Sequence, residues 1–342
     1  MRLYAIATGT GAADISCFRA VKSYATAAGT AKGDSDELRS LGAVKSYATQ
    51  STDVGDTTTL RSVKAYASHG PGVSDKRQAY EDVREETGYP HILISYVYDT
   101  DRKFADRLGY DPADWLGDSG AFTAWTMGTD VDLADLIEWC RYQVERSAAF
   151  QCISLDVIPG EAGGDRRPTT RERNRAMRQS LENGDAMRAA GLKIIEVFHV
   201  YEPLSHLDKL IERRQPGELL GLGGMVGRSE GVKRAFADEV FRRVRDRAGG
   251  WQDIVPVHGL GISVRSPIAA RYPWFSVDSS SWLAPAQYGK KVNAYGALYG
   301  DDERTRHKSV RHLYLVRALE GWLKQEAALT KMWAERGVTF AL

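Results

Sequence analysis

Acidic and histidine side chains recur directly after short apolar runs in this chain, and their types and spacing suit chemistry. The candidates are Asp118 in GDSGAF, Asp156 in SLDVIPG, His199 in EVFHVYE, His258 in VHGLGIS and Asp278 in FSVDSSSW. Carboxylates brought together at a sugar carbon divide the work: one attacks the anomeric carbon, and another handles the proton of the leaving or entering group. Repulsion between them raises one pKa, which suits general acid–base catalysis. We therefore expect an active site built from Asp118, Asp156 and Asp278.

Two glycine-rich turns accompany these residues. LGLGGMVG contains Gly223 and Gly224, and HGLGIS contains Gly259 and Gly261. Glycine lets the main chain approach a flat ligand closely, so that its amides or carbonyls can read the edge of a base. Tight turns between a strand and a helix need glycine as well, and that structural interpretation stays open. For the two histidines, a buried structural hydrogen bond is the alternative to a substrate contact.

The elements that must position these residues follow from the pattern of apolar runs. Most of the runs are followed by Gly, Pro, Asp or Ser and then by a segment of helical period. The predicted strands are Leu3–Ala7, Ile92–Tyr98, Trp115–Asp118, Cys152–Val157, Ile194–His199, Leu219–Gly223, Ile254–His258 and Trp274–Asp278. This alternation predicts an α/β fold, a (β/α)8 TIM barrel, whose strand C-termini bring the candidate residues to one rim.

The strand prediction divides the chain into a barrel domain and a terminal segment. The barrel domain is expected over residues 1–300, with a long insertion at 8–90 after the first strand, and helices are expected in a C-terminal segment at 301–342. The insertion repeats AVKSYAT at 20–26 and 43–49, with a looser copy, SVKAYAS, at 62–68. Lysine and tyrosine recur in each copy, including Lys64 and Tyr66, and suggest contacts with a phosphate backbone and with bases. A duplicated surface segment without chemistry is the alternative.

Composition narrows the class of protein. The 342 residues carry a formal net charge of +1 and are 43% hydrophobic, as in soluble globular proteins, and no apolar run reaches the roughly 20 residues that would span a bilayer. The start, MRLYAIATG, lacks the features of a secretion signal, so we expect a cytoplasmic protein. Three separated cysteines, Cys17, Cys140 and Cys152, are interpreted as free thiols, and no metal site is predicted.

Five of these segments together resemble a known family. DSGAF, LDVIPG, LGLGGMVG, HGLGIS and VDSSSW, in this order and spacing, resemble the tRNA-guanine transglycosylase (queuine tRNA-ribosyltransferase) superfamily. They are most similar to its phage-encoded relatives, which are thought to put 7-deazaguanine bases into DNA. The resemblance covers about residues 90–285. A phage-encoded member would work in the cytoplasm of the host cell.

The resemblance implies a role for each matched residue. Asp118 corresponds to the general acid/base, with Ser119 and Gly120 shaping its turn, and Asp278 corresponds to the nucleophile. Asp156 corresponds to the aspartate that recognises the guanine edge. The other residues expected to bind the base are Ser119, Gly120, His199, Gly223, Gly224 and His258. His199 stands near the position where the tRNA enzymes have a glutamine that contacts the base.

The implied reaction is a double displacement with retention. Asp278 attacks C1′, guanine leaves, and an incoming 7-deazaguanine such as preQ0, deprotonated by Asp118, takes its place without a cofactor. The expected partners are DNA, or tRNA, and the free base; a homodimer is left open. Nucleic-acid contacts are expected from Arg166, Arg167, Arg171 and Trp282, with Trp274 and Phe275 as further candidates for stacking on a flipped nucleotide.

Three alternatives remain at this stage. The polymer can be tRNA, although the zinc-binding Cys-x-Cys-x-x-Cys and later His of the tRNA enzymes are absent from the sequence. The barrel can be an N-glycosylase or glycoside hydrolase that uses Asp118 and Asp278 with water as acceptor. It can also be a non-catalytic barrel that binds nucleic acid, a role that has no need of both aspartates.

Overall fold

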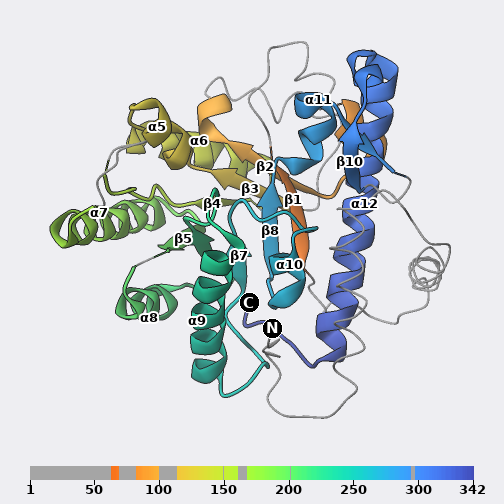
Figure 1. The fold of residues 1–342 in the computed structure, drawn as a ribbon. Helices are drawn as coiled ribbons and strands as arrows, with labels where there is room; N and C mark the ends of the chain where they lie inside the picture. The colour runs from red at the N-terminus through yellow and green to blue at the C-terminus, as the bar shows by residue number, and fades with distance from the viewer. Residues whose placement is uncertain are drawn as a thin grey trace.

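A closed barrel of parallel strands forms the centre of the protein. The computed structural model describes residues 63–68, 82–99, 114–148, 150–160, 168–200, 202–293 and 297–342. Within them, eight strands close in sequence order from β1 to β8, and helices lie around the outside of the barrel (Figure 1). The fold is therefore a (β/α)8 TIM barrel, as predicted.

The barrel strands are short. They are β1 Lys64–Ser68, β2 His91–Ser95, β3 Asp114–Asp118, β4 Gln151–Ile153, β5 Ile194–His199, β6 Leu220–Gly223, β7 Val257–Gly259 and β8 Ser276–Ser279. The helices that follow them are η3 Tyr96–Tyr98, α5 Ala121–Met127, α6 Leu133–Arg146, α7 Thr170–Ala189, α8 Leu204–Arg213, α9 Glu230–Ala248 and α10 Pro267–Arg271. After the barrel come η4 Ser281–Leu283, α11 Ala284–Tyr288, a hairpin of β9 Lys290–Val292 and β10 Leu298–Asp301, η5 Glu303–Arg306 and α12 Lys308–Glu335.

The first strand differs from the prediction. The other predicted strands overlap β2 to β8, but the strand that closes the barrel is Lys64–Ser68, inside the stretch assigned to an insertion. It pairs with β2 on one side and with β8 on the other. Leu3–Ala7 and the first two repeat copies lie outside the described residues. The third copy is thus part of the barrel, so 8–90 is not wholly an insertion after the first strand.

The two faces of β1 explain both its place and why it was missed. Tyr66 packs with the apolar side chains inside the barrel, whereas Ala65 and Ala67 pack in the layer between strands and helices. Lys64 Nζ lies 2.7 Å from Asp114 Oδ1, and Tyr66 is only 3% exposed. The suggestion that Lys64 and Tyr66 contact a nucleic acid is therefore wrong. Tyr66 is buried inside the barrel, and Lys64 is paired with Asp114.

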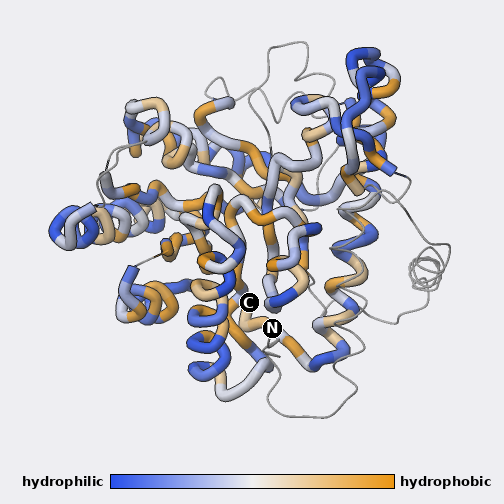
Figure 2. The backbone as a smooth tube through the Cα atoms, in the orientation of Figure 1, coloured by the Kyte–Doolittle hydropathy of each residue, from blue (hydrophilic) through white to orange (hydrophobic). Residues whose placement is uncertain are grey.

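Apolar packing on both faces of the strands holds the barrel together. The interior layer is formed by Tyr66, Leu93, Leu116, Ile153, Ile195, Val197, Leu219 and Phe275. Two further buried clusters pack the opposite strand faces against the surrounding helices. Figure 2 shows hydrophobic residues concentrated along the central strands, while α7 is largely hydrophilic. Burial on both faces accounts for the nearly continuous apolar runs that made β2 to β8 visible in the sequence.

The C-terminal helix packs on the outside of the barrel beside β1 and is tied to the barrel end opposite the candidate site. The predicted terminal helices include α12, a single helix of 28 residues. Its Glu326 accepts the Ala65 N–H at 3.0 Å through Oε2, and Oε1 lies 2.9 Å from His91 Nε2. The other ring nitrogen of His91 lies 3.0 Å from Asp114, which also pairs with Lys64. A polar network thus ties α12 to the first three strands.

None of the helices in the described part of the chain combines the length and hydropathy that crossing a bilayer requires.

We predict that Glu326→Ala lowers the free energy of unfolding by about 2–4 kcal/mol, because it leaves the Ala65 N–H without its acceptor and leaves Asp114 as the remaining carboxylate at His91. Burial alone would lower the pKa of His91, but Asp114 and Glu326 outweigh it and raise the pKa above its ordinary 6.5. The stabilisation from this histidine is therefore complete below pH 6.5 and is lost as the pH rises through its folded-state pKa. Urea unfolding should show a larger loss at pH 6 than at pH 9, with the exposed Glu320→Ala as control; equal losses at both pH values would contradict the role of His91.

Candidate active site

The predicted chemical residues meet at one rim of the barrel. Asp118 ends β3, His199 ends β5, Gly223 ends β6 and Asp278 lies near the end of β8. Strand register places Ser95 beside Asp118, His199 beside Gly223, and Tyr66 beside Asp278. Asp156 follows β4 by three residues and is linked to His199. The sequence prediction that these residues converge at the carboxyl ends of the strands agrees with this arrangement.

Asp118 is a partly buried carboxylate with a raised pKa. Burial is the main cause, and the charges of Asp278 and Asp156 act in the same direction, whereas hydrogen bonds from Ser95 and the Gly120 N–H oppose them; the result is a pKa of about 6. The Gly120 N–H donates to Asp118 Oδ1 at 3.1 Å. Because Asp278 and Asp156 act on its charge, all three carboxylates belong to one electrostatic site.

The turn after Asp118 depends on its next two residues. The Ser119 hydroxyl donates to the Ser154 carbonyl at 3.2 Å, which links the turn to the segment after β4. Gly120 has φ of 78° and begins α5, and a Cβ at this position would collide with Val97. Glycine is therefore required here for both conformation and space. Ser119 and Gly120 shape the turn in this structure, and contact with a base remains a prediction for both.

Asp278 is oriented by groups from β7 and from the turn that follows it. The Gly261 N–H donates to Asp278 Oδ1 at 2.9 Å, and His258 Nε2 lies 3.3 Å from the same oxygen. His258 is completely buried, and its Nδ1 lies 2.8 Å from the Ser276 hydroxyl. A direct base contact by His258 is therefore not available in this structure, because its ring is covered on all sides. Its place is against Asp278.

His199 lies between two carboxylates. Its Nε2 is 2.9 Å from Asp156 Oδ2, and its Nδ1 is 3.5 Å from Glu202 Oε1. Burial alone would lower the pKa of His199, but the hydrogen bonds and charges of Asp156 and Glu202 outweigh it and raise the pKa to about 10. At neutral pH the ring is therefore an imidazolium. Glu202 was missed by the sequence analysis, although the spacing of three residues from His199 is a signal that could have pointed to it.

The Gly-Gly turn lies beside this histidine. A Cβ on Gly223 would come within 2.9 Å of His199 Cδ2 and 2.8 Å of a Val197 methyl, so only glycine leaves room for the ring. Gly224 has φ of 74°, which favours glycine for its conformation. The structural interpretation of both glycines thus has a physical basis, and their contact with a base remains a prediction.

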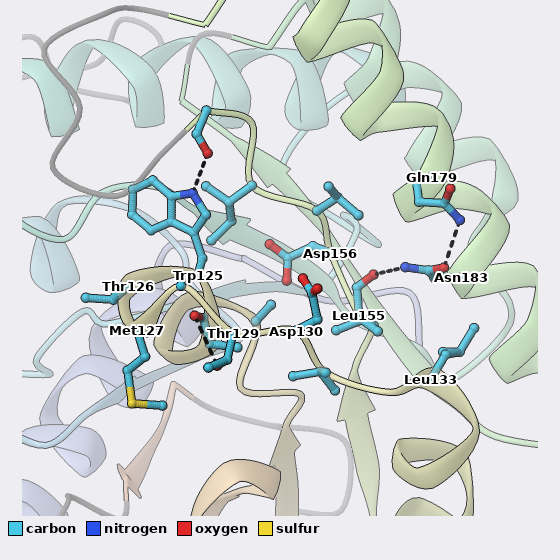
Figure 3. A pocket seen from close by; sticks show the side chains of 17 residues that line it. Trp125, Thr126, Met127, Thr129, Asp130, Leu133, Leu155, Asp156, Gln179 and Asn183 are labelled. Carbon is cyan, nitrogen blue, oxygen red and sulfur yellow. Dashed lines mark hydrogen bonds between the residues drawn. The ribbon is translucent and has the colours of Figure 1, made fainter.

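A cavity of about 810 Å³ opens next to Asp156 (Figure 3). It is bordered by α5 and the turn after it, by the segment after β4, and by α7. Trp125 forms part of its wall, fixed by a 2.8 Å hydrogen bond from its indole N–H to the Gly160 carbonyl. Asp130 and Asp156 bring carboxylates to it, while Asp118 and Asp278 are not among its described lining residues. The cavity is therefore of small-molecule size and reaches the rim at Asp156.

Of the four residues predicted to bind nucleic acid, the structure describes Arg171 and Trp282. Trp282 is 1% exposed, with Arg84 stacked 5.0 Å from its ring, and Trp274 and Phe275 are buried as well. The predicted stacking of Trp282 on a flipped nucleotide is wrong for this structure, because η4 turns the indole into the core. Arg171 is exposed in the first turn of α7, and its phosphate contact remains a prediction. Arg166 and Arg167 lie outside the described residues.

We predict that Asp118→Asn stabilises the fold at pH 8. A carboxyl whose folded-state pKa is raised to about 6 contributes stability below its ordinary pKa of 3.8, and that contribution is lost as the pH rises through 6. The amide removes this loss, so urea unfolding should give a gain of about 1–3 kcal/mol at pH 8 and a smaller gain at pH 5. Asp301→Asn, at an exposed carboxylate, serves as control. A destabilised variant at pH 8, or equal effects at the two pH values, would contradict the raised pKa.

Comparison with known proteins finds distant structural neighbours. No protein-family model and no curated protein matches the sequence. A solved structure from Aquifex aeolicus VF5 has a TM-score of 0.39 at 11% identity, over 76% of this chain and 93% of its own. The carboxyl transferase domain from Rhizobium etli pyruvate carboxylase has a TM-score of 0.35 at 14% identity, over 79% of this chain and 49% of its own. Neither similarity assigns a family or an activity to this chain.

Proposed function

We propose that the protein is a base-exchange glycosyltransferase that replaces guanine in DNA by a 7-deazaguanine such as preQ0, through a covalent Asp278–deoxyribosyl intermediate. The observation that carries the proposal is the contrast between two carboxylates at one rim. Asp118 has a pKa raised to about 6, while Asp278 is oriented by a main-chain N–H and flanked by His258. Two carboxylates with such different environments suit the roles of acid and nucleophile.

The first displacement uses both groups. Asp278 attacks C1′ of the deoxyribose, a bond forms between its carboxylate oxygen and C1′, and the bond from C1′ to the guanine nitrogen breaks. Asp118 in its protonated form gives its proton to the departing base. A pKa of about 6 leaves a usable protonated fraction near neutral pH, which an ordinary aspartate with a pKa of 3.8 lacks.

The second displacement reverses these steps with a new base. Asp118, now ionised, takes the ring N–H proton of the incoming 7-deazaguanine, whose nitrogen attacks C1′ as the Asp278 carboxylate leaves. Two inversions give overall retention, and each base exchanges one proton with Asp118, so no cofactor is consumed. The balance of atoms therefore needs only the polymer, the incoming base and the two aspartates.

The identity of base and polymer rests on the sequence resemblance. Asp156 corresponds to the aspartate that recognises the guanine edge, and a carboxylate can accept from the adjacent N–H groups of that edge. Asp156 lies beside a cavity of about 810 Å³, which is more than large enough for a purine-like base. The preference for DNA over tRNA follows from the likeness to the phage-encoded branch and from the missing zinc-binding cysteines.

We predict that the wild-type protein releases more than one equivalent of radiolabelled guanine from double-stranded DNA only when preQ0 is added, because without it the reaction stops at the covalent intermediate. Asp278→Asn should abolish release because it removes the nucleophile, and Asp118→Asn should slow release by about 10²–10⁴-fold because it removes the proton donor and acceptor. Asp301→Asn, at an exposed carboxylate at the end of β10, should match the wild type. The assay is run on DNA and on tRNA, with and without preQ0.

The other outcomes of this assay assign a different function. Exchange on tRNA alone contradicts the DNA assignment and moves the activity to the tRNA branch. Repeated guanine release without an added base, beyond one equivalent of the protein, contradicts base exchange and indicates an N-glycosylase. Undiminished exchange by Asp278→Asn contradicts the covalent mechanism.

A further inference from the structure

The Asp156 carboxylate is contacted by His199, which is itself contacted by Glu202. Asp156 follows β4, His199 ends β5, and Glu202 lies in the turn before α8. The ring of His199 bridges the other two residues, with Nε2 2.9 Å from Asp156 Oδ2 and Nδ1 3.5 Å from Glu202 Oε1. The side chains of Asp156, His199 and Glu202 are only 10%, 20% and 14% exposed. Asp156, His199 and Glu202 thus form a row of ionisable side chains to which water has little access.

Glu202 is fixed by the turn that it belongs to. Its Oε2 accepts the main-chain N–H of His199 at 2.8 Å, and its own main-chain N–H donates to the His199 carbonyl at 3.1 Å. These reciprocal bonds leave Oε1 facing the histidine ring. Glu202 is therefore pre-positioned by local structure and needs no ligand to reach its place.

The ring of His199 is confined from the neighbouring strand. His199 is the register partner of Gly223 on β6, and a Cβ on Gly223 would come within 3.0 Å of His199 Nε2. A Val197 methyl lies on the same side. The ring thus lies close to β6, with its Nε2 edge toward Asp156.

The charges that face His199 favour its protonated form. Asp156 and Glu202 are the carboxylates that raise its pKa to about 10, while His206 on α8 lies 3.9 Å from Glu202 and has a lowered pKa because it is buried. A protonated imidazole has two donors and no acceptor, and here each donor faces a carboxylate. His199 therefore has no hydrogen-bonding atom left for a ligand and acts on a base only through Asp156.

We propose that His199 and Glu202 are positioning residues that hold the Asp156 carboxylate in place, with Oδ2 occupied by His199, so that the site accepts bases whose edge presents adjacent N–H donors. Guanine and 7-deazaguanines carry such an edge, whereas adenine presents a ring acceptor, to which a carboxylate oxygen cannot donate. The Asp156 carboxylate also lines the cavity (Figure 3), which gives a base a route to it. This inference rests on the proposed function for the identity of the base, and it assigns to Glu202 a role that the resemblance does not give it.

The test compares the KM for the incoming base with kcat, from pH 6 to pH 10, in four variants. His199→Leu removes the donor to Asp156 and should raise KM by roughly 10- to 100-fold with a smaller effect on kcat. His199→Gln restores a donor without a titrating charge, so its KM should return close to the wild-type value and stay constant with pH.

Glu202→Gln removes one carboxylate and lowers the pKa of His199, so KM should rise with pH at a lower midpoint than in the wild type. Glu212→Gln, the same change at an exposed position of α8, should leave the wild-type profile.

A purely structural role would produce a different pattern. Glutamine would then fail to rescue position 199, or the Glu202→Gln profile would keep the wild-type midpoint; either result overturns the proposal. A KM for His199→Leu equal to that of the wild type overturns it as well.

Binding without turnover separates this inference from the proposed function. Calorimetry of free guanine, 7-deazaguanine and adenine with Asp278→Asn protein, alone and combined with each variant, reports on Asp156 without any exchange reaction. Guanine binding that is weakened by His199→Leu, rescued by His199→Gln and absent for adenine supports the inference even if the wild type exchanges no base. Equal binding of adenine and guanine overturns the inference even if exchange occurs, and binding of neither base overturns both.

Discussion

Like charges gathered at one end of a closed parallel barrel are the constraint on which the rest of this structure depends. Barrel closure points the carboxyl ends of β3, β4 and β8 to the same rim, so Asp118, Asp156 and Asp278 cannot be separated from one another. Each needs a different compensation to remain there. Asp118 responds with a raised pKa, Asp278 takes a main-chain N–H from Gly261, and Asp156 pairs with the His199 imidazolium. Three identical functional groups thereby acquire three different chemical characters.

The rest of the barrel holds these three carboxylates and their partners in place. The interior is filled by large apolar side chains. Near the end of the barrel opposite the rim, Phe340 packs against Phe275 with ring centres 5.2 Å apart. Beneath them, Glu326 of α12 is joined to β1 and β2, and Asp114 of β3 completes the network. The polar network lies at the end opposite the rim, and apolar side chains fill the barrel between the two ends. The charged rim is therefore the part of the barrel where a ligand can bind. This division agrees with the general placement of sites in the fold.

The sequence was most informative where a strand is buried on both faces. The strands β2 to β8 appear as apolar runs, and because parallel strands end at one rim, the convergence of Asp118, Asp156 and Asp278 could be predicted without coordinates. β1 could not be found in this way. Its KAYAS segment alternates alanine, small enough to pack under a helix, with lysine and tyrosine that a hydropathy pattern assigns to the surface. The charge of the lysine is paired with Asp114, a partner 50 residues away.

The misjudged site residues share a similar cause. Glu202 becomes part of the site through a turn whose side chain accepts from its own main chain, a contact that residue types alone do not predict. Trp282 lies four residues after the predicted nucleophile Asp278, which favoured a rim position. A short 3-10 helix, however, turns its indole into the core. His258 lies one residue deeper than the strand end, so its ring is buried beside Asp278 instead of facing the rim. Each of these errors concerns the direction of a side chain, which depends on tertiary packing more than on sequence pattern.

The central claim is that Asp278 forms a covalent bond to the sugar of a guanine nucleotide, and trapping that bond tests it most directly. The wild-type protein is mixed with a guanine-containing DNA oligonucleotide without an incoming base, quenched in acid, and examined by intact-protein and peptide mass spectrometry. The account predicts an added mass equal to the oligonucleotide less guanine, located on the peptide that carries Asp278 and absent from Asp278→Asn. An adduct on another residue, or loss of guanine from the oligonucleotide without any adduct, would contradict it.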